Sequence, residues 1–121
     1  MFQTIEIAVE TDFLLQHSQD FHYVFAYHIC IRNLGDSPVQ LLSRKWLITD
    51  ANGDKTEVQG DGVIGEQPVI AGKSEHRYSS FSVLKTPVGC MQGSYTMKDE
   101  AGNLFDAIIP TFTLAKSGML N

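Results

Sequence analysis

Residues 23–32 constrain the fold more than any other part of this sequence, because large apolar side chains alternate there with smaller or polar ones. The large set is Tyr23, Phe25, Tyr27, Ile29 and Ile31. Successive side chains of a β-strand point to opposite faces of its sheet, so this segment is predicted to be a strand with one buried face. No segment repeats its apolar residues with the 3.6-residue period of a helix. The core must therefore be built from sheets.

Further strands are predicted from alternation or from apolar runs that end at turn residues. They cover residues 4–10, 39–50, 55–58, 69–70, 75–84, 90–98 and 104–109, with a short tail strand near Phe112 and Leu114. Asn52-Gly53 between two of them favours a hairpin with a type I′ turn. Pro110 is expected to stop its strand or to move it to a sheet edge. Seven to eight antiparallel strands predict an all-β sandwich, formed by residues 1–121 as a single domain.

Charge and hydropathy exclude several classes of function. The 121 residues carry a formal net charge of −5, which argues against a nucleic-acid partner. No apolar run approaches the roughly 18–20 residues that span a bilayer, so no membrane insertion is expected. The first residues lack the basic and apolar regions of a signal peptide, and a cytoplasmic location is predicted. Cys30 and Cys90 are then expected to be free thiols, because each lies opposite the predicted core face of its strand.

Three glycines at positions 60, 62 and 65 form the pattern GxGxxG. In dinucleotide-binding folds this pattern precedes a helix whose N-terminus holds a pyrophosphate. Here Pro68 and Gly72 interrupt the following residues, so a site of that type is rejected. Two interpretations stay open. The glycines permit a tight turn with positive φ angles, or successive amides form a nest that binds an anion.

Two other groups of residues contain side chains that bind metals or act as nucleophiles. His28 and Cys30 share one strand face and would supply two ligands to a zinc or cobalt ion, but two more ligands would be needed. Two partly exposed strand residues are the more common explanation of such a pair. Ser79, Ser80 and Ser82 have no recognisable partner base in the sequence. No catalytic residue, metal site or cofactor is therefore predicted.

Several motifs, in order along the chain, resemble the ApaG family, from about residue 21 to residue 114. They are Tyr23-Val24-Phe25-Ala26-Tyr27, Leu41-Leu42-Ser43-Arg44-x-Trp46, Thr49-Asp50-x-Asn52-Gly53, the segment from Gly60 to Pro68, Thr86-Pro87, Met91-x-Gly93-x-Tyr95 and Phe105-Asp106. Lys45 departs from the family pattern, which usually has His there, and Ser80-Phe81 departs from an expected Gly-Cys. The resemblance implies a fold similar to fibronectin type III. It also implies a link to cobalt resistance and magnesium efflux, a protein-interaction role, and no established catalytic residues.

The function expected from these observations is a non-enzymatic binding module that acts through protein contacts, with an indirect role in cobalt and magnesium homeostasis. The expected surface is the loop of Gly60, Asp61, Gly62, Gly65, Glu66, Gln67 and Pro68, with Arg44 and Trp46 as interface residues beside it. The alternative for the last two is that Trp46 lies in the core and Arg44 is merely solvated. The alternative function is binding of a divalent cation or a phosphorylated nucleotide at residues 60–65. An exposed strand edge would also permit a homodimer.

Overall fold

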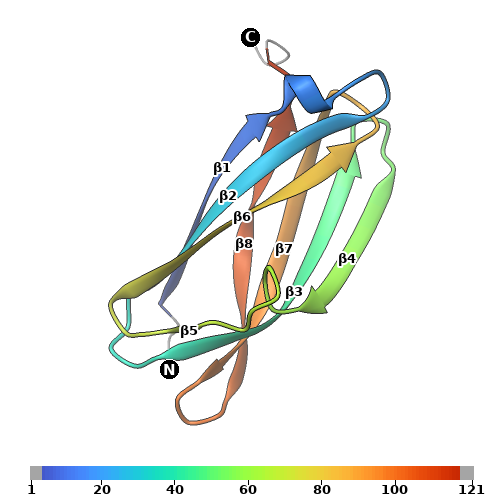
Figure 1. The fold of residues 1–121 in the computed structure, drawn as a ribbon. Helices are drawn as coiled ribbons and strands as arrows, with labels where there is room; N and C mark the ends of the chain where they lie inside the picture. Colours follow the sequence, from blue (N-terminus) through green and yellow to red (C-terminus); the bar gives the residue numbers. More distant parts are fainter. Residues whose placement is uncertain (1–3, 118–121) are drawn as a thin grey trace.

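Two antiparallel sheets packed face to face make up the computed structural model, which describes residues 4–117 (Figure 1). One sheet has the strand order β1-β2-β6, with β1 (Ile5–Phe13), β2 (Tyr23–Asn33) and β6 (Ser74–Leu84). The other has the order β4-β3-β7-β8, with β4 (Lys55–Asp61), β3 (Val39–Asp50), β7 (Val88–Asp99) and β8 (Leu104–Ala115), and β5 (Val69–Ile70) pairs with the start of β3. A 3-10 turn, Leu15–His17, follows β1. The predicted all-β sandwich of seven to eight antiparallel strands is confirmed.

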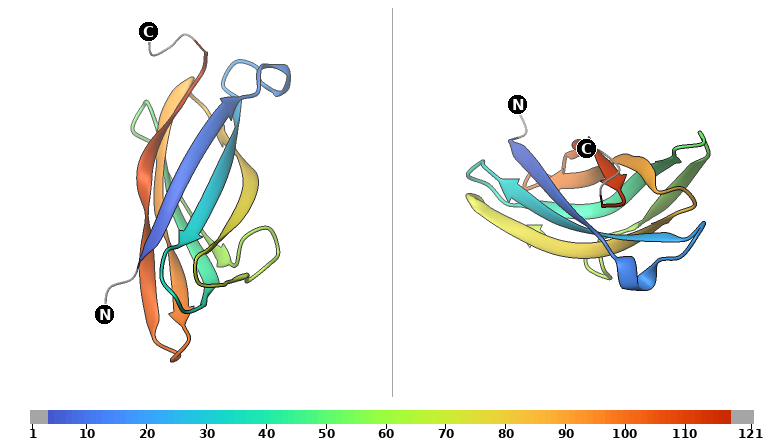
Figure 2. Two further views of the ribbon diagram at one scale, coloured as in Figure 1. Left: turned by 90° about the vertical axis from the view of Figure 1, so that its left-hand side faces the viewer. Right: turned by 90° about the horizontal axis from the view of Figure 1, so that it is seen from above.

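The core lies between the sheets and follows the alternation of the sequence. Phe25, Ile29 and Ile31 of β2 are buried against Met91 and Tyr95 of β7 in one continuous cluster. Figure 2 shows the two layers from the side and from above. Within residues 4–117, no helix is long and apolar enough to cross a membrane.

The hairpin between β3 and β4 is confirmed, but its predicted type I′ turn is wrong. Four residues, Ala51 to Asp54, separate the two strands, and among these only Gly53 has a positive φ angle, +91°. A type I′ turn needs positive φ at both of its central residues. Instead, the Gly53 N–H donates to the Asp50 carbonyl, and the Asn52 side chain accepts from the Asp54 N–H. The Asp50 N–H donates to the Asp54 carbonyl, so this is the hairpin arrangement in which a glycine with positive φ follows an ordinary turn.

Strand β8 continues through Pro110 to Ala115, so the proline does not stop it. The β7–β8 pairing shifts register between Met91 and Gly93, opposite this part of β8. β8 is also the last strand of its sheet, where a proline need not donate to a neighbour. Of the two outcomes expected for Pro110, the edge position is therefore the correct one.

Candidate functional site

The glycine loop closes on itself as a tight turn between β4 and β5. Ile64 and Gly65 are its central residues, and both have positive φ angles, +47° and +75°. The turn is closed by two backbone hydrogen bonds, from the Val63 N–H to the Glu66 carbonyl at 2.8 Å and from the Glu66 N–H to the Val63 carbonyl at 3.0 Å. Positive φ at both central residues defines a type I′ turn. The turn interpretation of the glycine pattern therefore describes this loop.

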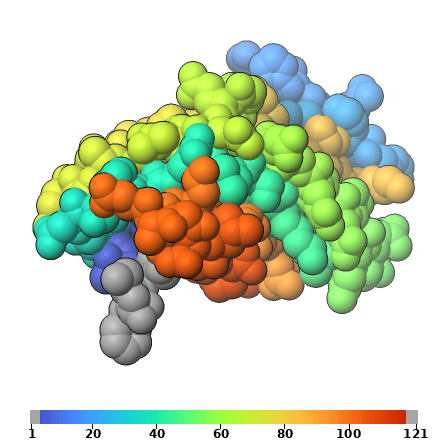
Figure 3. Space-filling model, turned by 90° about the horizontal axis from the view of Figure 1, so that it is seen from below, coloured from blue at the N-terminus to red at the C-terminus, as the bar shows by residue number. Residues whose placement is uncertain are grey.

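The same loop is fastened to strand β3 from both sides. The Gly62 N–H and the Gln67 side-chain amide both donate to the Leu42 carbonyl, at 2.8 and 2.9 Å. The Leu41 N–H donates to the Pro68 carbonyl at 3.0 Å. Val63 is buried in the core between the two fastened ends. The loop is thus a fixed part of the sandwich, and Figure 3 shows it, in lime green, projecting beyond the neighbouring strands.

The Arg44 side chain hydrogen-bonds to the backbone at the start of the loop. Its Nη1 donates to the carbonyls of Asp61 at 3.2 Å and Gly62 at 2.9 Å. The guanidinium lies directly over Gly60, where a Cβ atom would be 2.8 Å from Nη1. Glycine is required at position 60 because any larger residue would collide with the Arg44 guanidinium packed against the backbone. Arg44 supports the loop from behind rather than standing free on the surface.

Trp46 and Gly62 belong to the predicted surface, but both are buried in the structure. For Trp46 this changes the expected role. Its side chain is 2% exposed and packs edge-on against Tyr27, Tyr95 and Phe112. The reason is its place on β3, where its side chain points between the sheets. The expectation of Trp46 as an interface residue is corrected, and its alternative, a core tryptophan, is what the structure shows. Asp61, Gly65, Glu66 and Gln67 are exposed as the loop surface requires.

Tyr78 of β6 and Tyr95 of β7 join the two sheets near Arg44. Their hydroxyl groups hydrogen-bond to each other across the sandwich. Burial raises the pKa of both phenols well above the usual value, because the interior disfavours the phenolate anion. Both hydroxyls are therefore neutral at physiological pH, and the pair is a structural link beside the loop.

Ile64 is the functional candidate that the sequence analysis missed. Its side chain is 63% exposed at the tip of the turn, although it is large and apolar. A β-branched residue rarely adopts a positive φ angle, because the Cβ branches crowd the backbone. The only signal in the sequence is its place between Val63 and Gly65 in a turn, and propensity alone argues against a turn centred on isoleucine.

An anion nest would need amides that are free to donate. The N–H groups of Gly62, Val63 and Glu66 all donate to backbone carbonyls of the protein itself. Among residues 4–117, no three His, Cys, Asp or Glu side chains lie close enough to hold a metal ion. Binding of a divalent cation or nucleotide at residues 60–65 stays a prediction.

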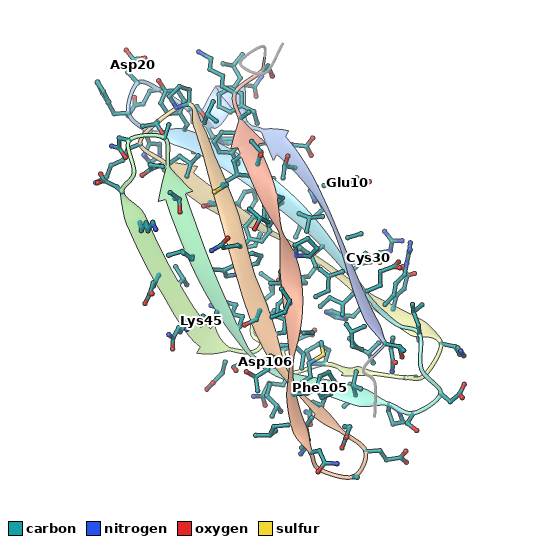
Figure 4. All side chains as sticks on the ribbon, turned by 180° about the vertical axis from the view of Figure 1, so that it is seen from behind. Glu10, Asp20, Cys30, Lys45, Phe105 and Asp106 are labelled. Atoms are coloured by element: carbon teal, nitrogen blue, oxygen red, sulfur yellow. The ribbon has the colours of Figure 1, made fainter. Side chains whose placement is uncertain are left out.

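His28 and Cys30, considered above as metal ligands, take other partners on the outer face of the β1-β2-β6 sheet. Figure 4 labels Glu10 and Cys30, which lie on strands of this sheet, and Lys45 and Asp106, which lie on strands of the other sheet. The Cys30 thiol lies 3.4 Å from a carboxylate oxygen of Glu75. Arg77 donates to the same carboxylate, and this contact holds the pKa of Glu75 below its usual value. Both cysteines are free thiols, as predicted.

Ser79 does have a partner base, contrary to the expectation from sequence. His28 Nδ1 lies 2.6 Å from Ser79 Oγ, and His28 Nε2 lies 2.8 Å from Asp12 Oδ2. The three residues lie on the neighbouring strands β6, β2 and β1, and only the strand order brings them together. The His28 and Asp12 side chains are well exposed, so water competes for both bonds. We assign this chain of bonds the structural role of tying three strands together.

The comparisons with known proteins agree with one another. A family model described as the ApaG domain matches residues 15–99. Protein ApaG of Vibrio campbellii is 50% identical over 119 residues, which is 97% of this chain and 94% of that protein. Protein ApaG of Sodalis glossinidius is 56% identical over 99 residues, 82% of this chain and 79% of that protein.

Solved structures with a similar fold include one that is also similar in sequence. The crystal structure of a putative ApaA protein from Bordetella pertussis superposes with a TM-score of 0.93 at 36% identity and covers 96% of each chain. A protein from Archaeoglobus fulgidus has a TM-score of 0.59 at 10% identity, covering 94% of this chain and 98% of that one. At that identity the likeness concerns the fold alone.

Proposed function

The chain belongs to the ApaG family, and we propose that it is a small binding module, without enzymatic activity of its own, that acts through protein–protein contacts. The proposed surface is the loop from Gly60 to Pro68, supported from behind by Arg44. We also propose a cytoplasmic location and, for the family's link to cobalt resistance and magnesium efflux, an indirect role through a transporter or a regulator.

Ile64 is the observation that carries the proposal. An exposed β-branched residue with positive φ costs on the order of 1–3 kcal/mol of backbone strain, and such strain persists where a functional site requires it. Its apolar side chain is held out from a loop that hydrogen bonds to β3 fix in place. A partner that binds Ile64 does not have to order the loop, so little affinity is lost to conformational entropy.

Polar side chains accompany Ile64 on the loop, and Glu66 and Arg77 line one hollow with it. Asp61, Glu66 and Gln67 are exposed on the same loop, and Val69 adds a second exposed apolar side chain just after it. An apolar centre with a polar rim is the usual anatomy of a protein interface. The acidic side chains of Asp61 and Glu66 favour a partner surface that carries Lys or Arg.

The test is a comparison of captured proteins. Wild-type protein, Ile64→Asn, Asp61→Lys and Leu15→Asn would be immobilised and exposed to lysate of the source organism. Leu15 is the matched control, because it is exposed and apolar but lies on the 3-10 turn after β1. We expect a defined set of proteins to be lost with Ile64→Asn and Asp61→Lys and kept with Leu15→Asn. An identical set for all four samples would contradict the proposed surface.

A further inference from the structure

Strand β6 is an open edge of the smaller sheet. Within residues 4–117 it pairs with β2 on one side and with no strand on the other. An edge strand presents backbone N–H and C=O groups that another extended chain can pair with, and most proteins protect such edges with charges, prolines or bulges. Strand β6 carries fewer such protective residues than the edge strands β1, β4 and β8.

The other three edge strands carry protective residues. Acidic side chains Glu6, Glu10 and Asp12 project from β1; Lys55, Glu57 and Asp61 lie on β4; and β8 contains Asp106 and Pro110. By contrast, β6 has no charged residue and no proline from Tyr78 to Leu84. Its outward side chains there include Phe81, 67% exposed, and Val83, 50% exposed. This part of β6 is therefore an unprotected edge with an apolar outer face.

The apolar face continues from the edge into the sheet. Phe81 pairs with Ala26 of β2, and Val83 pairs with Val24. A strand added beside β6 would bring its own outward side chains next to Phe81 and Val83, which would cover apolar surface in addition to forming backbone hydrogen bonds.

A second copy of this chain or a segment of another protein could pair with this edge, and the charges along β6 favour the segment of another protein. Arg77 and Lys85 flank the apolar stretch, and residues 77–85 contain no acidic side chain. If a second copy paired its β6 antiparallel about Phe81, Arg77 would face Lys85 of the other copy at both ends. Like charges directly opposite each other destabilise strand pairing. Arg77 Nε donates to Glu75, but most of the side chain is exposed and the guanidinium has further N–H donors.

We propose that the free edge of β6 binds an extended segment of another protein, which adds as a fourth strand to the β1-β2-β6 sheet. The segment has apolar side chains at alternate positions, facing Phe81 and Val83, and an acidic residue at each end, facing Arg77 and Lys85. The loop at Ile64 borders the start of this edge, because Ile64 and Glu66 line one hollow with Arg77, Tyr78 and Ser79, whereas Phe81 and Val83 lie outside that hollow. The proposal rests on Phe81, Val83 and the flanking charges, and it does not depend on the function proposed above.

The probe is a capped nine-residue peptide, Asp-Thr-Val-Thr-Val-Thr-Val-Thr-Asp, titrated into ¹⁵N-labelled full-length protein. We expect saturable amide shifts confined to β6 and its neighbour β2. The same peptide with Lys at both ends should bind at least about tenfold more weakly, because two attractive ion pairs become repulsive. Added salt should narrow this difference.

Substitutions on β6 and on the other sheet show which surface binds the peptide. Phe81→Ser and Val83→Ser should each weaken binding of the acidic peptide severalfold. Ile108→Ser is the matched control, since Ile108 is exposed and apolar on the other sheet, and it should bind as wild type.

Three results would overturn the proposal. The first is no shift at millimolar peptide, and the second is equal affinity for the acidic and the basic peptide. The third is shifts on β6 that grow with protein concentration in the absence of peptide, which would assign the edge to a second copy of the chain.

Discussion

Gly62 and Gly65 both have positive φ angles but lie in different surroundings. A Cβ atom on Gly62 would lie 2.0 Å from the Glu66 carbonyl oxygen, whereas one on Gly65 would meet nothing within 4 Å. Gly65→Ala should therefore cost only the backbone strain, about 1 kcal/mol. Gly62→Ala adds a collision with backbone and should cost at least about 2 kcal/mol more. Urea unfolding of the two variants checks this, and equal losses of stability would contradict the loop geometry.

Replacing Ile64 by asparagine should stabilise the protein, unlike the two glycine substitutions. Asparagine tolerates the left-handed region that isoleucine avoids, so Ile64→Asn should raise the free energy of unfolding by about 1 kcal/mol. Ile108→Asn, at an exposed position in extended strand β8, is the control and should not gain stability. Urea midpoints measured side by side decide the matter. A clear loss of stability in Ile64→Asn would mean that the residue is not strained and would remove the main support for the loop as a functional surface.

At the scale of elements, the Tyr78–Tyr95 pair joins β6 to β7 and makes stability depend on alkaline pH. Burial raises the pKa of both phenols above the unfolded value of about 10. Above that pH the unfolded chain releases protons that the folded protein retains, so stability present below about pH 10 declines as pH rises. The double variant Tyr78→Phe with Tyr95→Phe should lose less stability over this range. Unfolding midpoints between pH 8 and pH 11 measure both proteins, and parallel curves would count against the account.

The elements themselves were largely predictable, because alternation reports directly on which side chains a sheet buries. The positions of β1, β2 and β7 follow from it, whereas β6 is only weakly patterned. Turn type was harder to predict. Asn52-Gly53 has the composition of a type I′ turn and does not form one, while Ile64-Gly65 forms one against the preference of isoleucine. The Ile64-Gly65 turn is closed by the bridge between Val63 and Glu66 and held by bonds to the Leu42 carbonyl, and such tertiary contacts override the local preference.

The candidate site was only partly predictable for a related reason. The glycines of the loop could be found in one segment of sequence, and Arg44 lies close to them only because β3 pairs with β4. Trp46 was misplaced at the surface because its residue type suits an interface and a core equally well. Ser79, His28 and Asp12 meet across three strands, and nothing in their sequence separation indicates it.

For the whole molecule, the two sheets separate the thiols onto different outer faces. Cys30 is 6% exposed, with its thiol turned to Glu75, whereas Cys90 is partly exposed on β7. A thiol reagent should therefore modify Cys90 rapidly and Cys30 slowly in the folded protein, and both at the same rate in concentrated urea. Cys90→Ser serves as the control and should leave only the slow phase. A single fast phase that accounts for two thiols in folded wild-type protein would contradict this arrangement.

We propose that the loop held by β3 and Arg44 presents Ile64 to a protein partner. The most direct measurement is photo-crosslinking in living cells with a photoreactive amino acid in place of Glu66, next to the tip of the turn, and in place of Leu15 as the control. A distinct protein adduct should form from position 66 and not from position 15, and it should disappear when Ile64→Asn is added. If no adduct forms at position 66, or if Ile64→Asn leaves it unchanged, the loop is not the partner-binding surface.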